Sequence, residues 1–150
     1  MLRLYFMRHG ETVWNTERRY QGMTDIELSE EGLRQAECAA KRFKNIKIDK
    51  IYASPLKRAM KTAEKIAAEK GLEIISEDDF REIHFGEWEG KTVPELTEKY
   101  GESYTNFIRE PHKYGFPGEG SVENVINRIK PGIDRLIAEE KGNVLIVSHG

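Results

Sequence analysis

The sequence predicts an α/β fold with a mostly parallel central sheet and helices on both of its faces. Short apolar runs, typical of buried strands, alternate with amphipathic helical patterns, and this alternation is typical of parallel sheets. The 150 residues suffice for one domain with its own core and are too few for two. We therefore expect a single domain over residues 1–150.

Four apolar runs are expected to form the strands of this sheet. They cover residues Leu2–Met7, Ile51–Ala53, Leu72–Ser76 and Val144–Val147. Bulky aliphatic and aromatic residues dominate these runs, as they do in strands that pack on both sides. The last run is apolar at every position, which is typical of a central parallel strand with two covered faces.

Two helices are expected to follow the first two strands. The first begins at Ser29 as its N-cap and carries an apolar stripe at three- and four-residue spacing, made of Leu33, Ala36, Ala40 and Phe43. The second is capped by Ser54 and ends at Gly71. Arg58 is expected on the exposed side of its first turn. The buried face of this second helix is expected to contain Leu56, Ala59, Met60, Ala63, Ile66 and Ala67.

Two further helical patterns lie between the third and fourth strands. Thr92 and Glu95 stand in capping-box positions at the start of one helix. The other starts after Ser121 and carries an apolar face of Val122, Val125, Ile126, Ile129, Ile133, Leu136 and Ile137. Because the Pro131-Gly132 pair lies inside this pattern, we expect a kink or break there.

The composition narrows the range of partners. The chain has 24 Lys and Arg against 26 Asp and Glu, so it offers no electrostatic reason to bind nucleic acid or an anionic membrane. Its single cysteine, Cys38, cannot form an internal disulfide, and the N-terminal apolar run is too short for a signal peptide or a membrane span. We therefore expect a soluble cytoplasmic protein.

Two of the predicted strands end in a histidine that is followed by glycine. The first strand leads into Arg8 and His9, and the last leads into His149. Because neighbouring parallel strands end at the same edge of a sheet, the two imidazoles would face each other there. Arg58 adds a guanidinium at a helix start, where free N–H groups and the helix dipole favour an anion. These four side chains predict a pocket for a phosphoryl group.

Five sequence blocks resemble the histidine phosphatase superfamily, also called the phosphoglycerate-mutase-like family, and they occur in the family's order. They are "MRHGETVWN" at 7–15, "YQGMTDIELSEEG" at 20–32, "ASPLKRAMKTA" at 53–63, "REIHFGEWEG" at 81–90 and "VSHG" at 147–150. The resemblance runs the length of the chain. It implies the phosphoglycerate-mutase-like form of the α/β fold.

The resemblance also implies a role for each residue of the predicted pocket. His9 would be the nucleophile that forms a phosphohistidine, while Arg8, Arg58 and His149 would hold the phosphoryl oxygens. The family's proton donor falls on Glu82. Such a carboxylic acid can protonate the leaving alkoxide and then accept a proton from the attacking water.

Three further positions, Asn15, Gln21 and Gly22, match residues that commonly line the phosphate pocket in this family. A hydrogen bond to the second ring nitrogen of His9 would fix the tautomer in which the attacking nitrogen is free. No metal or other cofactor is expected, because the arginines and His149 can stabilise the developing charge.

Other polar residues near these blocks are expected to play lesser parts. His84 would share a strand face with Glu82 and be packed or solvated, and His112 is expected at the surface. Glu87 and Glu89 are expected to be solvated.

Mutases and phosphatases of this family share the residues named above. Mutases that resemble this chain carry a long insertion with basic residues before the second histidine, whereas only 58 residues separate Gly90 from His149 here. We therefore expect a phosphatase acting on a small phosphorylated metabolite. The sequence most resembles α-ribazole phosphatases of cobalamin synthesis and related broad-specificity phosphatases. Residues 113–121 are rich in Gly and Pro, and we expect them to form a loop on the active-site side.

Several alternatives remain open. They are a phosphoglycerate mutase, a protein phosphatase or phosphohistidine regulator, and a catalytically inactive module that binds a phosphorylated ligand. The inactive module is disfavoured, because every catalytic position holds a competent residue.

The C-terminus raises a separate expectation. Members of the family continue past the "SHG" block, and the run Val144–Val147 is apolar on both faces. A bare strand of this kind would expose a large apolar patch. We therefore expect that C-terminal elements are missing and that the chain is truncated, or that a second copy covers the gap in a homodimer.

Overall fold

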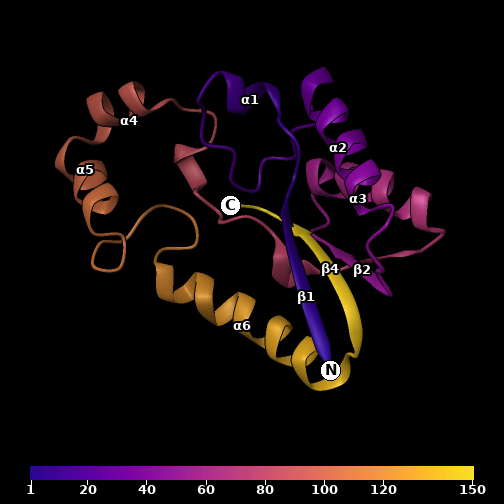
Figure 1. Ribbon diagram of the computed structural model, residues 1–150. Coiled ribbons are helices and arrows are strands. Elements are labelled where there is room, and N and C mark those ends of the chain that lie inside the picture. The colour runs from indigo at the N-terminus through magenta and orange to yellow at the C-terminus, as the bar shows by residue number, and fades with distance from the viewer.

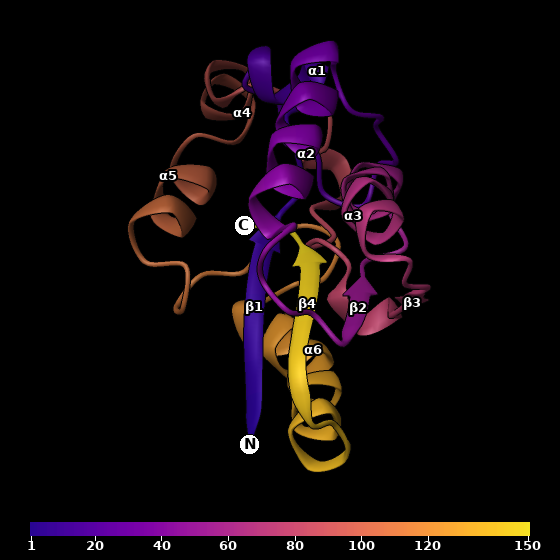
Figure 2. The same cartoon turned by 45° about the vertical axis from the view of Figure 1, so that its right-hand side comes forward.

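The computed structural model describes all 150 residues, which form one four-stranded sheet with helices on both faces (Figure 1). The strands are β1 (Leu2–Arg8), β2 (Lys50–Ala53), β3 (Ile74–Ser76) and β4 (Gly142–Ser148). Their order in the sheet is β1-β4-β2-β3, and every pairing is parallel. Figure 2 shows this order across the sheet. The predicted fold class is therefore confirmed.

Helices connect the strands and cover the sheet. They are α1 (Val13–Thr16), α2 (Glu30–Phe43), α3 (Lys57–Lys70), α4 (Val93–Tyr100), α5 (Glu102–Arg109) and α6 (Val122–Glu139), with the 3-10 turns η1 (Asp78–Phe80) and η2 (Gly86–Trp88). In Figure 1, α4 and α5 lie apart from the sheet, on the opposite side of the molecule from α2 and α3. None of the helices combines the length and hydropathy that crossing a bilayer requires.

Strand β4 forms the centre of the core. Its residues Val144–Val147 are at most 1% exposed. Leu145 and Val147 pack against the α2 and α3 side, while Val144 and Ile146 pack against Leu136 of α6. The expectation that this strand lacks a cover is therefore wrong, because α6 covers its second face.

Several predicted helix boundaries are confirmed. Ser29 caps α2, Thr92 and Glu95 form the capping box of α4, and Gly71 ends α3 in the left-handed conformation that favours glycine. Within α2, Leu33 is 37% exposed rather than buried, so the buried face of that helix consists mainly of smaller residues.

The predicted start of α3 is wrong in two respects. Leu56 is the N-cap, and Ser54 lies one residue beyond β2, where its N–H continues the strand ladder to the carbonyl of Val147 at 3.0 Å. Ser54 is therefore not the N-cap of the helix; its hydroxyl accepts the N–H of Leu56 at 3.3 Å and shares a hydrogen bond with His149. Arg58 is fully buried rather than on the exposed side.

Helix α6 differs from its prediction at the centre and along one face. It continues through Pro131, so the predicted break is absent. Gly132 faces η1 closely, since a Cβ there would lie 3.0 Å from the side chain of Asp79. Two residues of the predicted apolar face, Ile126 and Ile137, are exposed. The face that packs on the sheet is therefore narrower than its apolar pattern suggests.

Candidate active site

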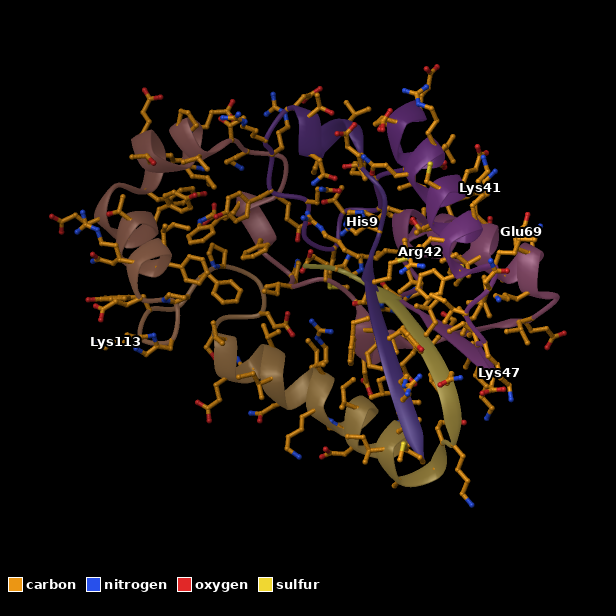
Figure 3. The ribbon with its side chains drawn as sticks, viewed as in Figure 1. His9, Lys41, Arg42, Lys47, Glu69 and Lys113 are labelled. Atoms are coloured by element: carbon orange, nitrogen blue, oxygen red, sulfur yellow. The ribbon has the colours of Figure 1, made fainter.

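The two predicted histidines meet where β1 and β4 end. Arg8 pairs with Ser148 in the parallel register of these strands, and the N–H of His9 donates to the Ser148 carbonyl at 3.0 Å. The chain therefore carries His9 and His149 side by side past the same sheet edge. Their ring centroids lie 5.2 Å apart. Figure 3 shows His9 just beyond the tip of β1, in the interior of the molecule.

The protonation of His9 follows from its surroundings. Its Nδ1 lies 2.6 Å from the carbonyl oxygen of Gly10, and because a carbonyl can only accept, Nδ1 must carry the hydrogen. Burial lowers the pKa of His9 to about 4, with a smaller contribution from the positive charges of Arg58 and Arg8. At neutral pH the ring is therefore uncharged, with a free lone pair on Nε2, as a nucleophile requires.

The ring of His149 is also neutral. Burial, with a smaller contribution from the positive charge of Arg58, lowers the pKa of His149 to about 2. Its Nε2 shares a hydrogen bond of 2.8 Å with the Ser54 hydroxyl, which itself accepts the N–H of Leu56. We assign the Ser54 hydroxyl as the donor and Nε2 as the acceptor of this hydrogen bond, so the ring carries its hydrogen on Nδ1. This buried Nδ1 has no hydrogen-bond partner in the protein.

Arg58 is fully buried and held from one side. Its two terminal nitrogens donate to the carbonyls of Gly22 at 2.7 Å and Thr24 at 2.9 Å. Burial lowers its pKa, an effect opposed by the carboxylates of Glu82, Asp25 and others, and an arginine remains charged at neutral pH. The Nε of Arg58, like Nδ1 of His149, is buried without a partner.

These two unpartnered donors indicate a ligand site. Leaving a buried donor without an acceptor costs on the order of 1–3 kcal/mol, so such groups are normally satisfied. Here both belong to side chains that sit close enough to His9 to interact with it electrostatically. An oxyanion bound in front of His9 would supply the missing acceptors.

Glu82 completes this group. It is mostly buried, and its Oε2 lies 3.9 Å from Nδ1 of His149. Burial raises the pKa of Glu82, while the N–H of Ile83, which donates to Oε1 at 2.9 Å, and the charge of Arg58 act against that rise. A carboxyl group with a raised pKa suits a proton donor. His84 does not share a strand face with Glu82, because residues 81–85 form no strand.

The segment that carries Glu82 is fixed from α6. Arg128 donates to the carbonyls of Asp79 at 2.9 Å, Arg81 at 3.1 Å and Glu82 at 3.3 Å. Its guanidinium also pairs with Glu119 at 2.6 Å, which links the Glu82 segment to the Gly- and Pro-rich loop. Arg128 was not among the predicted site residues.

An open pocket of about 330 Å³ leads to His9. Its lining residues are Arg8, His9, Glu11, Asn15 and Gln35. The Oδ1 of Asn15 accepts the N–H of Thr12 at 2.9 Å, so its amide NH₂ remains available to a ligand. Glu11 and Gln35 were not predicted, although Glu11 lies within the first of the resembling blocks.

Gln21 and Gly22 lie behind the pocket rather than in its lining. The Oε1 of Gln21 accepts a hydrogen bond of 2.8 Å from the hydroxyl of Thr12, and Gly22 contributes its carbonyl to Arg58. Both residues therefore support side chains of the site. Of the predicted set, the structure brings together Arg8, His9, Asn15, Arg58, Glu82 and His149 directly.

Two further residues connect to the site without having been predicted for it. Thr62 accepts the N–H of Gly10 at 3.0 Å and donates to the carbonyl of Arg58 at 2.7 Å. Its four-residue spacing from Arg58 is a signal that could have identified it. Glu89 was expected in solvent, yet its side chain is only 12% exposed and its carboxylate accepts several hydrogen bonds. Glu87 is exposed as expected, and so is His112.

Comparisons with known proteins agree with this geometry. The family model of the histidine phosphatase superfamily (branch 1) matches residues 4–150. The chain is 42% identical to phosphoserine phosphatase 1 of Hydrogenobacter thermophilus, over 99% of this chain and 71% of that protein.

Two solved structures are similar over almost the whole chain. Phosphoserine phosphatase of Entamoeba histolytica, in complex with 3-phosphoglyceric acid, superposes with a TM-score of 0.86 at 36% identity, covering 100% of this chain and 75% of that one. A putative α-ribazole-5'-P phosphatase of Escherichia coli gives a TM-score of 0.89 at 27% identity, covering 99% and 73%.

Proposed function

Since the chain belongs to the histidine phosphatase superfamily, we propose that it hydrolyses small phosphomonoesters through a phosphohistidine on His9. The observation that carries this proposal is the tautomer of His9. Its Nδ1–H donates a hydrogen bond to the Gly10 carbonyl, so the unprotonated Nε2 is free to attack. Near it lie buried donors without hydrogen-bond partners on Arg58 and His149.

In the first step, Nε2 of His9 attacks phosphorus and the bond between phosphorus and the leaving oxygen breaks. The carboxylic acid of Glu82 gives its proton to that oxygen, so the alcohol departs neutral. Arg58 and His149 donate hydrogen bonds to the phosphoryl oxygens as charge develops on them. Arg8, exposed at the mouth of the pocket, contributes a second positive charge.

In the second step, water attacks the phosphorus of the phosphohistidine. The Glu82 carboxylate accepts a proton from this water, the bond between phosphorus and nitrogen breaks, and inorganic phosphate leaves. His9 and Glu82 thereby return to their starting states, so the cycle needs no cofactor.

Three-carbon phosphorylated acids such as phosphoserine and 3-phosphoglycerate are the first substrates to test. The similarity to phosphoserine phosphatases, at 42% and 36% identity, favours them. α-Ribazole 5'-phosphate is the second candidate, supported by the structural similarity to a putative α-ribazole-5'-P phosphatase at 27% identity.

A turnover screen with phosphate release as the readout tests the proposal. Phosphoserine, 3-phosphoglycerate, α-ribazole 5'-phosphate and a phosphopeptide are compared, each with and without a metal chelator. We expect release from at least one small phosphomonoester, unchanged by the chelator and absent in His9→Ala. Formation of 2-phosphoglycerate without phosphate release would instead identify a mutase, and binding without turnover would identify a ligand-binding module.

A further inference from the structure

The carboxylate of Glu89 joins two segments of the active site that are far apart in the sequence. Its Oε1 accepts the N–H groups of Met23 at 3.1 Å and Phe85 at 3.0 Å, and its Oε2 accepts the N–H of Thr24 at 3.0 Å and the Thr24 hydroxyl. We propose that Glu89 is a positioning residue, which holds Arg58 and Glu82 in register with His9. The inference rests on the proposed function, because it assigns those two residues their roles.

The first segment held by Glu89 is the one that fixes Arg58. The carbonyls of Gly22 and Thr24 accept hydrogen bonds from the two terminal nitrogens of Arg58. On the other side of the same turn, Glu89 accepts the N–H groups of Met23 and Thr24. The turn therefore lies between a carboxylate on its N–H side and a guanidinium on its carbonyl side. Moving the turn would move the Nε donor of Arg58 relative to a bound phosphoryl group.

Gly22 shows how closely the carboxylate approaches this turn. A Cβ on Gly22 would lie 2.2 Å from Oε1 of Glu89, and Gly22 has φ +54°, which favours glycine. Glycine at this position therefore leaves room for the carboxylate. It also allows the backbone to direct its carbonyl toward Arg58.

The second segment held by Glu89 is the one that carries Glu82. Phe85 follows Glu82 by three residues, and its N–H donates to the Glu89 carboxylate. The neighbouring N–H of His84 donates to Glu119 at 3.1 Å. Two carboxylates thus bind consecutive backbone N–H groups just after the proton donor, so they limit how far Glu82 can shift.

Glu87 offers a matched comparison on the same short stretch. It lies two residues before Glu89, its side chain is exposed, and its carboxylate pairs with Lys99 at 3.8 Å on the surface. It contacts neither the Arg58 turn nor the Glu82 segment through its carboxylate. Glu87→Gln therefore changes the net charge of the protein by the same amount as Glu89→Gln, but it leaves the hydrogen bonds of the Arg58 turn and the Glu82 segment in place.

The test compares Glu89→Gln with Glu87→Gln. A glutamine at position 89 retains one acceptor oxygen but presents an NH₂ group to backbone donors, so part of the clamp is lost. We expect kcat/KM to fall about tenfold and the Kd of orthovanadate, measured by calorimetry, to rise by a similar factor. Glu87→Gln should match the wild type in both.

The direction of the vanadate effect separates positioning from other causes. Removing a negative charge near an anion site would by itself strengthen vanadate binding, so weaker binding reports the displaced Arg58. A purely structural role would lower the folded fraction, leaving the vanadate Kd of the remaining protein unchanged. Thr24→Val, which removes one donor to Glu89 and keeps the side-chain volume, should give a smaller loss in the same direction.

Unchanged or tighter vanadate binding in Glu89→Gln, or a loss equal to that of Glu87→Gln, would overturn the inference. Calorimetry does not depend on turnover. A wild-type protein that binds vanadate but releases no phosphate therefore contradicts the proposed function alone, and the comparison of variants still decides the role of Glu89.

Discussion

The active site consists of two halves that are built in different ways. His9 and His149 leave adjacent strands, and the backbone ladder between β1 and β4 places them before any side chain takes part. The guanidinium of Arg58, which projects from helix α3, and the carboxyl group of Glu82 depend instead on irregular segments. The carboxylates of Glu89 and Glu119 accept hydrogen bonds from the backbone of these segments, and Arg128 donates hydrogen bonds to it. A regular sheet thus places the proposed nucleophile, whereas hydrogen bonds with side chains position the groups that we propose to bind the phosphoryl oxygens and to transfer protons.

The largest effect should follow from removing the guanidinium of Arg58. Arg58→Ala deletes the buried Nε donor, and we expect kcat/KM to fall about 10²- to 10³-fold, as when one preorganised oxyanion donor is removed. Lys57→Ala, at the exposed neighbouring position, is the matched control and should stay near wild type. Equal activity in the two variants would mean that Arg58 has only a structural role.

The next effect should depend on the substrate. Glu82→Gln removes the proposed proton donor, and we expect alkyl phosphates to lose on the order of 10²-fold or more in kcat, while nitrophenyl phosphates lose much less. The reason is that a stable phenolate needs no proton to leave. Equal losses for both classes, with formation of the phosphoenzyme measured separately, would assign Glu82 a positioning role.

The titratable groups of the two halves should also change the stability of the protein in opposite directions as the pH changes. In the folded protein His9 and His149 have pKa values of about 4 and 2, below the usual 6.5. As the pH drops below 6.5, these histidines therefore bind protons in the unfolded chain but not in the folded protein, and the free energy of unfolding falls. Glu82 has a raised pKa, so its contribution to stability is lost as the pH rises through that value.

Urea unfolding at several pH values between 4.5 and 7 measures this difference. The slope should reach at most about 1.4 kcal/mol per pH unit for each histidine, and His9→Ala should flatten it. A free energy of unfolding that stays constant as the pH falls would contradict the neutral, buried state of the imidazoles.

The smallest effect concerns the clamp from α6. Arg128→Met removes the donors to the carbonyls of Arg81 and Glu82 and keeps much of the side-chain length. We expect kcat to fall about tenfold, less than the roughly 10²-fold that a full ångström of misplacement can cost. Lys130→Met, an exposed change on the same helix, should leave kcat unchanged. A larger loss of kcat in Lys130→Met than in Arg128→Met would show that the loss comes from a general disturbance of α6 rather than from the missing hydrogen bonds of Arg128.

The difference between the halves also explains what the sequence could predict. Apolar runs that end in His-Gly locate His9 and His149, because strand periodicity is visible in the residues themselves. Glu89 shows no such pattern: a glutamate beside a tryptophan is as compatible with solvent as with a buried carboxylate. Its role depends on which backbone N–H groups the fold brings to it.

The same limit applies to helix positions. Ser54 and Arg58 fit the pattern of an exposed helix start, but the strand before them brings both toward His149. Helix α5 was not predicted, and only Gly101, which has a positive φ, separates it from α4. Tertiary contacts, rather than local propensity, decide these positions.

Trapping the phosphoenzyme tests the central claim most directly. The wild-type protein and His9→Ala are mixed with a ³²P-labelled phosphomonoester that turns over, quenched within milliseconds, and digested to locate the label. We predict an acid-labile, base-stable phosphoryl group on the peptide that contains His9 in the wild type, and none in the variant. Label on another residue, or turnover by His9→Ala at the wild-type rate, would contradict the account.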